Sequence, residues 1–266
     1  MPSSPPIVLA FAASDPTGGA GLQADLLTLA SLGCHPLSVL TGLTVQDTNG
    51  VESLHAIEPA WIAGQARRVL EDIPVAAFKL GVLGSAANAR IIATILGEHP
   101  GIPVVLDPVL ASGRGDPLAD EEIVQVLRAA LLARTAVLTP NSVEARCLSL
   151  AGRDASLPDC ARELTKLGCK FVLVTGTHEP GTQVTNTLYD ARGMVREDHW
   201  QRLPGSYHGS GCTLASAIAA LIARGLDVEN AVQAAQHYTW QALAAGFRPG
   251  RGQHLPDRFF DTRSGR

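Results

Sequence analysis

The chain has 266 residues, 46% of them hydrophobic, and a formal net charge of −4. Its length suffices for a full core within one domain, and the weak negative charge argues against nucleic acid as a partner. We expect no secretion signal and no membrane span, because the apolar runs are short and lack a basic leader, and five cysteines without a CxxC pair favour a reducing cytoplasm.

Short apolar runs alternate with helical patterns through the first two thirds of the chain. The apolar runs predict strands buried on both faces, at 7–13, 37–41, 76–80, 104–106, 136–138 and 171–174. Helical patterns lie between them, at 20–32, 59–70, 86–96, 118–132, 142–150 and 159–167. This alternation predicts βαβ units and a mainly parallel sheet with helices on both sides.

The pattern changes after residue 174. Segments 186–189 and 194–200 flank a turn, which predicts an antiparallel hairpin at the sheet edge. Two predicted helices follow, at 210–224 and 228–245. We expect one domain over residues 1–266, with the residues from about 247 onward loosely ordered because they are rich in Arg, Gly and Pro.

In a parallel sheet, the loops that leave the carboxyl ends of the strands line the ligand crevice. Functional residues are therefore expected in 14–25, 42–50, 107–117 and 204–213. The glycines of the first segment match neither the Rossmann GxGxxG nor a P-loop, and no GxSxG elbow is present. These absences disfavour a nicotinamide dehydrogenase and an α/β-hydrolase.

A glycine-rich turn, Gly209-Ser210-Gly211-Cys212, opens the first of the two closing helices. Unpaired backbone N–H groups and the helix dipole converge there, so the turn could stabilise a transferring phosphoryl group without a lysine. The same field should favour the thiolate of Cys212, which could then accept a proton. The alternative is that these are ordinary loop glycines and that Cys212 is a small packed residue.

Other polar residues in the expected segments have two interpretations each. Asp25 could contact a substrate amine or hydroxyl, or could favour the start of its helix. Gln46 suits the edge of an aminopyrimidine, although turn chemistry explains the same segment. Asp107 is placed to touch a metal or a phosphate. Asn141 and Glu144 fit a capping box, and the same pair can organise Mg2+-bound water near a triphosphate.

Taken together, five segments closely resemble the hydroxymethylpyrimidine/phosphomethylpyrimidine kinases of the ribokinase superfamily. They are AASDPTGGAGLQADL (12–26), LTVQDTNGV (43–51), LDPV with GDPL (106–109 and 115–118), TPNSVEA (139–145) and HGSGCTLASAIAA (208–220). The resemblance covers residues 7–245. It implies a ribokinase-like three-layer α/β/α sandwich, with a mostly parallel sheet and an antiparallel edge, that uses ATP and Mg2+ and forms a homodimer. The family phosphorylates 4-amino-5-hydroxymethyl-2-methylpyrimidine and then its monophosphate in thiamine diphosphate biosynthesis.

The resemblance also implies roles for individual residues. It places five at the substrate: Gln46, Asp25, Ala13, Gly19 and Val109. It makes Gly209, Ser210 and Gly211 an anion hole, with Cys212 as the candidate base. It assigns five residues to the ATP phosphates: Asn141, Glu144, Asp107, Thr175 and Arg114. Of these, Asp107 and Glu144 would serve Mg2+ through water.

One departure from the family pattern leaves alternatives open. Thr175 stands where the family has a lysine that contacts ATP phosphates, and Arg114, one residue from the usual position of another lysine, would have to compensate. Of the two reactions, the second phosphorylation is the one that the absence of this lysine should weaken most. A pyridoxal kinase of the same superfamily and a non-catalytic protein that binds a nucleotide or a thiamine precursor are the two alternatives.

Overall fold

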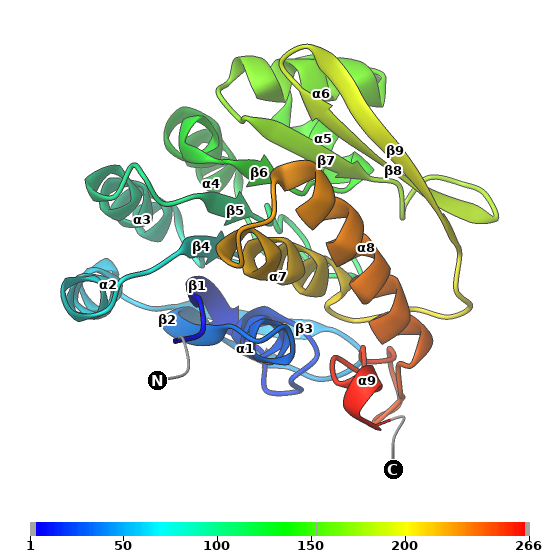
Figure 1. Cartoon of the computed structure of the whole chain (residues 1–266), viewed down its shortest axis with the longest axis horizontal. Coiled ribbons are helices and arrows are strands. Elements are labelled where there is room, and N and C mark those ends of the chain that lie inside the picture. The colour runs from blue at the N-terminus through cyan, green and yellow to red at the C-terminus, as the bar shows by residue number, and fades with distance from the viewer. Residues whose placement is uncertain (1–3, 153, 264–266) are drawn as a thin grey trace.

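A mixed sheet runs through the structure, and helices cover both of its faces (Figure 1). The computed structural model describes residues 4–152 and 154–263. Within these ranges the sheet has nine strands in the order β3-β2-β1-β4-β5-β6-β7-β8-β9. The central strands β2, β1, β4, β5, β6 and β7 are parallel to one another. At the two edges, β3 pairs antiparallel with β2, and β8 pairs antiparallel with β7 and β9. The predicted α/β/α class with a mostly parallel sheet is confirmed.

The strands are β1 (Ile7–Ser14), β2 (His35–Gln46), β3 (Val51–Ala56), β4 (Ala77–Leu80), β5 (Val104–Leu106), β6 (Val137–Leu138), β7 (Phe171–Thr175), β8 (Gln183–Asp190) and β9 (Gly193–Gln201). The α-helices are α1 (Gly21–Ser31), α2 (Pro59–Asp72), α3 (Ala86–Glu98), α4 (Glu121–Val126), α5 (Ser142–Leu148), α6 (Leu157–Lys166), α7 (Ser210–Ala223), α8 (Val228–Ala244) and α9 (Phe260–Arg263). In the described ranges no helix combines the length and apolarity that a bilayer crossing requires.

Alternate side chains of β1 enter two different cores. Leu9 and Phe11 pack into the layer formed by α2 to α6. The smaller Ala10 and Ala12 face the layer of α1, α7 and α8, where α7 itself contributes many alanines. Small side chains on both surfaces let α7 lie close against the middle of the sheet. The N-terminus of α7 is thereby brought to the carboxyl edge of the parallel strands.

Two predicted segments differ from the structure. The strand predicted at 37–41 extends to Gln46, and β3 pairs with it as an antiparallel partner that was not predicted. β3 was missed because it is largely exposed and has no continuous apolar run. The helix predicted at 118–132 begins only after Asp120, whose carboxylate accepts a hydrogen bond from Ile123 N, and it changes to a π-helical turn at Leu127.

Residues 255–258 of the tail after Gly246 are buried, in contrast to the expected loose order. Phe247 pairs with Leu255, and both Leu255 and Arg258 are buried. Loose order was wrongly expected from the Arg, Gly and Pro content, because the segment is held by hydrogen bonds to loops far away in the sequence, such as that of Gln253 N to Thr48 O. Residues 264–266 lie outside the described ranges.

One ion pair lies inside the core, between β4 and α1. Lys79 and Asp25 are both fully buried, and Lys79 Nζ lies 2.6 Å from Asp25 Oδ1. Ser216 of α7 donates a hydrogen bond to the same oxygen over 2.8 Å. Burial alone would lower the pKa of Lys79, but the carboxylate of Asp25 raises it, so the lysine stays protonated. The pair therefore joins α1, the sheet and α7.

Removal of one partner from this pair should cost more than removal of both. Lys79→Met leaves a buried carboxylate without its cation and should lower the free energy of unfolding by about 3–5 kcal/mol. In Lys79→Met/Asp25→Asn neither member of the pair carries a charge, and the Asn oxygen can still accept from Ser216, so the loss should be smaller. Urea denaturation followed by circular dichroism measures both. A double variant less stable than Lys79→Met would contradict the argument.

Candidate active site at the carboxyl edge of the sheet

A cavity of about 440 Å³ lies along the carboxyl ends of the parallel strands. Its walls come from the ends of β1, β2 and β7, the loops after β5 and β6, and the residues that lead into α7. The volume is typical of a site for a small molecule. The predicted position of the site, at the loops leaving the strands, agrees with this cavity.

Most of the residues singled out in the sequence line this cavity. They are Ala13, Gln46, Asp107, Val109, Asn141, Glu144, Thr175, Gly209, Ser210, Gly211 and Cys212. Asp25, Gly19 and Arg114 do not line the cavity, although Gly19 lies directly beside Gly209. Asp25 is in the buried ion pair, Gly19 packs against the side chains of His208 and Leu255, and Arg114 is exposed and donates to the carbonyl oxygen of Asn49. The role of Arg114 as a replacement for the missing lysine stays a prediction.

The turn before α7 presents backbone amides to the cavity. Gly209 has φ +78°, and a Cβ at this position would overlap the carbonyl oxygen of Gly19. Only glycine fits such a conformation at such a close approach. Within the described chain no side chain caps the first turn of α7, and Ser210 and Gly211 line the cavity. The geometry is that of an anion site at a helix N-terminus.

The expected thiolate of Cys212 is contradicted by its surroundings. Burial raises the pKa of Cys212 to about 12; Lys79 opposes this rise, and the carboxylates of Asp107 and Asp25 add to it. The helix field was expected to lower this pKa, but the side chain is only 8% exposed and two of its neighbours are anionic. Cys212 is a neutral thiol at physiological pH.

Asp107, which follows β5, faces the same turn. Its carboxylate is 4% exposed, and its Oδ2 has no hydrogen-bond partner among the described residues. Both carboxylate oxygens lie within 3.7 Å of where a Cβ on Gly211 would stand. Burial raises the pKa of Asp107 to about 6, although Lys79 opposes the rise. The site thus holds a buried carboxylate oxygen that is free to take a proton or to bind a cation.

Asn141 and Glu144 form the predicted capping box at the start of α5. Asn141 Oδ1 accepts from Glu144 N over 2.9 Å, and Glu144 Oε2 accepts from Asn141 N over 2.9 Å. Burial raises the pKa of Glu144 to about 8, and the carboxylate of Asp107 adds to the rise. A cation near both carboxylates would relieve this repulsion, so the residues fit Mg2+. No group of three or more His, Cys, Asp or Glu side chains that could hold a metal ion occurs in the described part of the chain.

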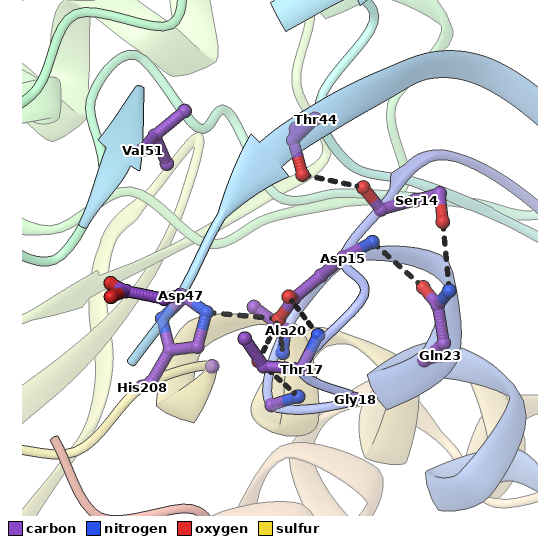
Figure 2. A network of polar contacts seen from close by, with 12 residues as sticks. Ser14, Asp15, Thr17, Gly18, Ala20, Gln23, Thr44, Asp47, Val51 and His208 are labelled. Carbon is purple, nitrogen blue, oxygen red and sulfur yellow. Dashed lines mark hydrogen bonds and ion pairs between the residues drawn. The ribbon is translucent and has the colours of Figure 1, made fainter. Parts of the chain in front are cut away.

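A hydrogen-bond network in the first glycine loop was not predicted (Figure 2). The carboxylate of Asp15 accepts from the backbone N–H groups of Thr17 and Ala20 and from the Thr17 hydroxyl. His208, which directly precedes Gly209, lies 2.9 Å from Asp15 Oδ2 through its Nε2. Burial alone would raise the pKa of Asp15, but the hydrogen bonds of His208, Ala20 and Thr17 lower it to about 2. The bonds to Thr17 are typical of an Asx turn and could have been predicted, but the bond to His208 could not.

Apolar side chains from the antiparallel edge of the sheet and from α8 also line the cavity. They are Val184, Trp200, Leu203, Trp240 and Leu243. Sequence reasoning missed this surface because its residues lie far apart in the chain and each looks like an ordinary core or surface position. An apolar slot of this kind suits a flat aromatic ring such as a nucleotide base.

Arg202 also lines the cavity, but its hydrogen bonds are made within the protein. Its guanidinium donates to the carbonyl oxygens of Gly181, Thr177 and Glu179. Thr175, at the end of β7, offers only a hydroxyl at the position of the missing lysine. The amides of the turn before α7, which no side chain in the described chain caps, are available as donors to an anion.

Comparison with known proteins assigns this architecture to a family. The chain matches the model described as phosphomethylpyrimidine kinase over residues 15–257. A hydroxymethylpyrimidine/phosphomethylpyrimidine kinase of Mycobacterium tuberculosis strain H37Rv is 41% identical over 257 residues, which cover 94% of this chain and 92% of that protein. Its counterpart in Escherichia coli K12 is 36% identical, covering 89% of this chain and 90% of that protein.

Solved structures share the fold. The pyridoxal kinase of Staphylococcus aureus in complex with pyridoxal superposes with a TM-score of 0.89 at 24% identity, covering 98% of this chain and 96% of that one. The phosphomethylpyrimidine kinase of Clostridium difficile gives a TM-score of 0.76 at 32% identity, covering 88% of this chain and 97% of that one. The fold is therefore ribokinase-like, as expected.

The ionised Asp15 should stabilise the fold in a pH-dependent way. Its pKa of about 2 in the folded chain lies below the ordinary 3.8, so the stabilisation is complete above about pH 4 and is lost as the pH falls towards about 2. Asp15→Asn should be less stable than the unaltered chain at neutral pH, and the difference should shrink in acid. Urea denaturation across that range measures it. Asp47→Asn, which removes an exposed carboxylate from a similar turn, is the control and should change stability less. A difference that stays constant down to about pH 3 would contradict the role of Asp15.

Proposed function

The chain belongs to the phosphomethylpyrimidine kinase family, and from its cavity we propose how it phosphorylates 4-amino-5-hydroxymethyl-2-methylpyrimidine and then the monophosphate of that alcohol with ATP. The kinase activity predicted from the sequence, a step of thiamine biosynthesis, is confirmed by the family and by the names of its relatives. The observation that carries the mechanism is the uncapped turn Gly209–Cys212, which opens on the same cavity as Gln46 and Asp107.

The substrate ring is proposed to lie between the ends of β1 and β2 and the loop after β5. Gln46 lines the cavity at the end of β2, where its planar amide can both donate to and accept from an aminopyrimidine edge. Ala13 and Val109 add apolar surface on either side. In this position the hydroxymethyl group points towards the turn before α7.

The migrating phosphoryl group is proposed to be held by the amides of Gly209–Cys212. Charge that develops on its oxygens during transfer is stabilised by fixed donors in a site that partly excludes water. Each such donor is worth roughly 100- to 1,000-fold in rate. The adenine ring would lie against the apolar side chains of Trp200 and Val184, which line the same cavity.

The proton of the substrate hydroxyl is proposed to pass to Asp107 and not directly to Cys212. Asp107 is largely ionised at neutral pH, and its Oδ2 is free within the described chain. The neutral thiol of Cys212 hydrogen-bonds to this carboxylate and orients it. Asp107 and Glu144 would also hold Mg2+ through water, and the ion would supply positive charge to the triphosphate.

The assembly around this site is also a proposal. We infer that the chain works as one kinase domain in the cytoplasm and forms a homodimer. The exposed Leu43 and Val45 of β2, beside the edge strand β3, offer an apolar surface for a second copy. The structural likeness to pyridoxal kinases favours pyridoxal as the alternative substrate.

An assay of ADP release tests the proposed function, with the pyrimidine alcohol, its monophosphate and pyridoxal offered separately in the presence of Mg2+. Turnover of both pyrimidines should exceed that of pyridoxal. ADP release with pyridoxal alone would favour the alternative substrate. Release with the alcohol but not with the monophosphate would show that the amides cannot replace the lysine missing at Thr175 in the second step.

Two substitutions separate the roles of Asp107 and Cys212. Asp107→Asn removes the proposed proton acceptor and should lower kcat about 100- to 10,000-fold. Cys212→Ala should lower kcat much less, because the thiol only orients the carboxylate. Cys34→Ala, which removes a buried cysteine outside the cavity, is the control and should leave kcat unchanged. A loss in Cys212→Ala as large as that in Asp107→Asn would return the role of base to the cysteine.

A further inference from the structure

The segment 247–258 crosses back over the loops that form the substrate end of the cavity. His208 N donates to the carbonyl oxygen of His254 over 2.9 Å, next to the turn before α7. Gln253 N donates to the carbonyl oxygen of Thr48 over 2.8 Å, in the loop after β2. The segment thus bonds to two loops that lie far apart in the sequence and that flank one site.

Arg258 extends these contacts to a third loop. Its guanidinium is buried, with the residue 4% exposed. Nη2 donates to the carbonyl oxygen of Gly19 over 2.6 Å, and Nη1 donates to that of Gly18 over 3.3 Å. Nε donates to Thr213 Oγ1 over 3.2 Å, in the first turn of α7. These three hydrogen bonds of Arg258, to Gly18, Gly19 and Thr213, form a clamp that holds the loop between β1 and α1 against α7.

The contact beneath this clamp is unusually close. The backbones of Gly19 and Gly209 approach so closely that a Cβ on Gly209 would overlap the carbonyl oxygen of Gly19. The hydroxyl of Thr213 also donates to the carbonyl oxygen of Gly209 over 2.8 Å, so the clamp reaches the turn itself. A shift of the glycine loop would therefore move the amides of the turn relative to the substrate.

The side chain of arginine can make these three hydrogen bonds at once, whereas that of lysine cannot. The hydrogen bonds of its fork to Thr213, Gly18 and Gly19 all go to neutral oxygens, in fixed directions that a lysine ammonium cannot reproduce. Burying a cation is costly. The neighbouring carboxylates of Asp25 and Asp15 favour its charged form, although burial opposes it and lowers the pKa of Arg258. The buried guanidinium thus joins the glycine loop to the start of α7.

We propose that Arg258 is a positioning residue for phosphoryl transfer, which fixes the distance between the substrate and the amides of Gly209–Cys212 by joining Gly18 and Gly19 to Thr213. This inference rests on the proposed function. Misplacement of reacting groups by about 1 Å costs about 100-fold in rate, which sets the scale of the expected effect. Trp200 and Val184, which line the cavity from the antiparallel strands β9 and β8, make none of the hydrogen bonds of Arg258, so ADP binding against them should be unaffected.

The test compares Arg258→Ala and Arg258→Lys with the unaltered chain in the ADP-release assay, with kcat expressed per folded protein. Both variants should lose about 100-fold in kcat with the pyrimidine alcohol, while the Kd for ADP stays within about threefold. Guanidinium ions, added below denaturing concentration, should raise the kcat of Arg258→Ala but not that of the unaltered chain, because the ion can enter the vacated space.

Arg128→Ala is the matched control. Arg128 also donates to main-chain carbonyl oxygens, those of Leu148 and Cys147, but it does so outside the cavity. This variant should lower Tm without a change in kcat. If Arg258→Ala behaves in the same way, with full kcat and only a lower Tm, the positioning role is overturned.

Two further results keep the test decisive. If neither Arg258 variant folds, Thr213→Val, which removes one acceptor of the clamp, should still lose kcat, and full kcat in that variant would overturn the proposal. If the unaltered chain itself releases no ADP with either pyrimidine, it is the proposed function that fails. An active unaltered chain with fully active Arg258 variants would instead reject the positioning role alone.

Discussion

The contact between two glycine backbones holds the site together. Gly19 follows β1 and Gly209 precedes α7. A Cβ on Gly209 would overlap the backbone of Gly19, and a Cβ on Gly19 would meet the side chains of Leu255 and His208. This approach places an uncapped helix N-terminus beside the carboxyl edge of the sheet, where Asp107 and the capping box at Asn141 already stand. The small residues of β1 and α7 make it possible, because a bulkier interface would hold the helix further from the strands.

Much of this arrangement could be predicted from the sequence, because it follows local rules. Alternating apolar runs and helical patterns predict a parallel sheet. In such a sheet, loops such as Gly209–Cys212 are expected to meet at the carboxyl ends of the strands. The Asn141–Glu144 capping box needs only three residues of spacing to be recognised. Asp107 was found for the same reason, since it directly follows a buried strand.

Contacts between residues far apart in the sequence could not be predicted by these local rules. The bond of Asp15 to His208, the pair of Lys79 with Asp25 and the clamp of Arg258 each join segments whose spacing in the chain carries no periodic signal. The state of Cys212 was misjudged because the helix field is visible in a sequence, whereas burial beside two carboxylates is not. β3 was missed because an exposed edge strand has little of the apolar pattern that marks a central one.

The path of residues 247–258 has a consequence for how the protein is made. A chain emerges from the ribosome from its N-terminus, and most of the sheet and its helices precede this segment. The glycine loop after β1 is thus synthesised long before Arg258, the residue that holds it. The nascent chain can bury its two cores first and must leave the substrate end of its cavity unfinished until the last loop arrives.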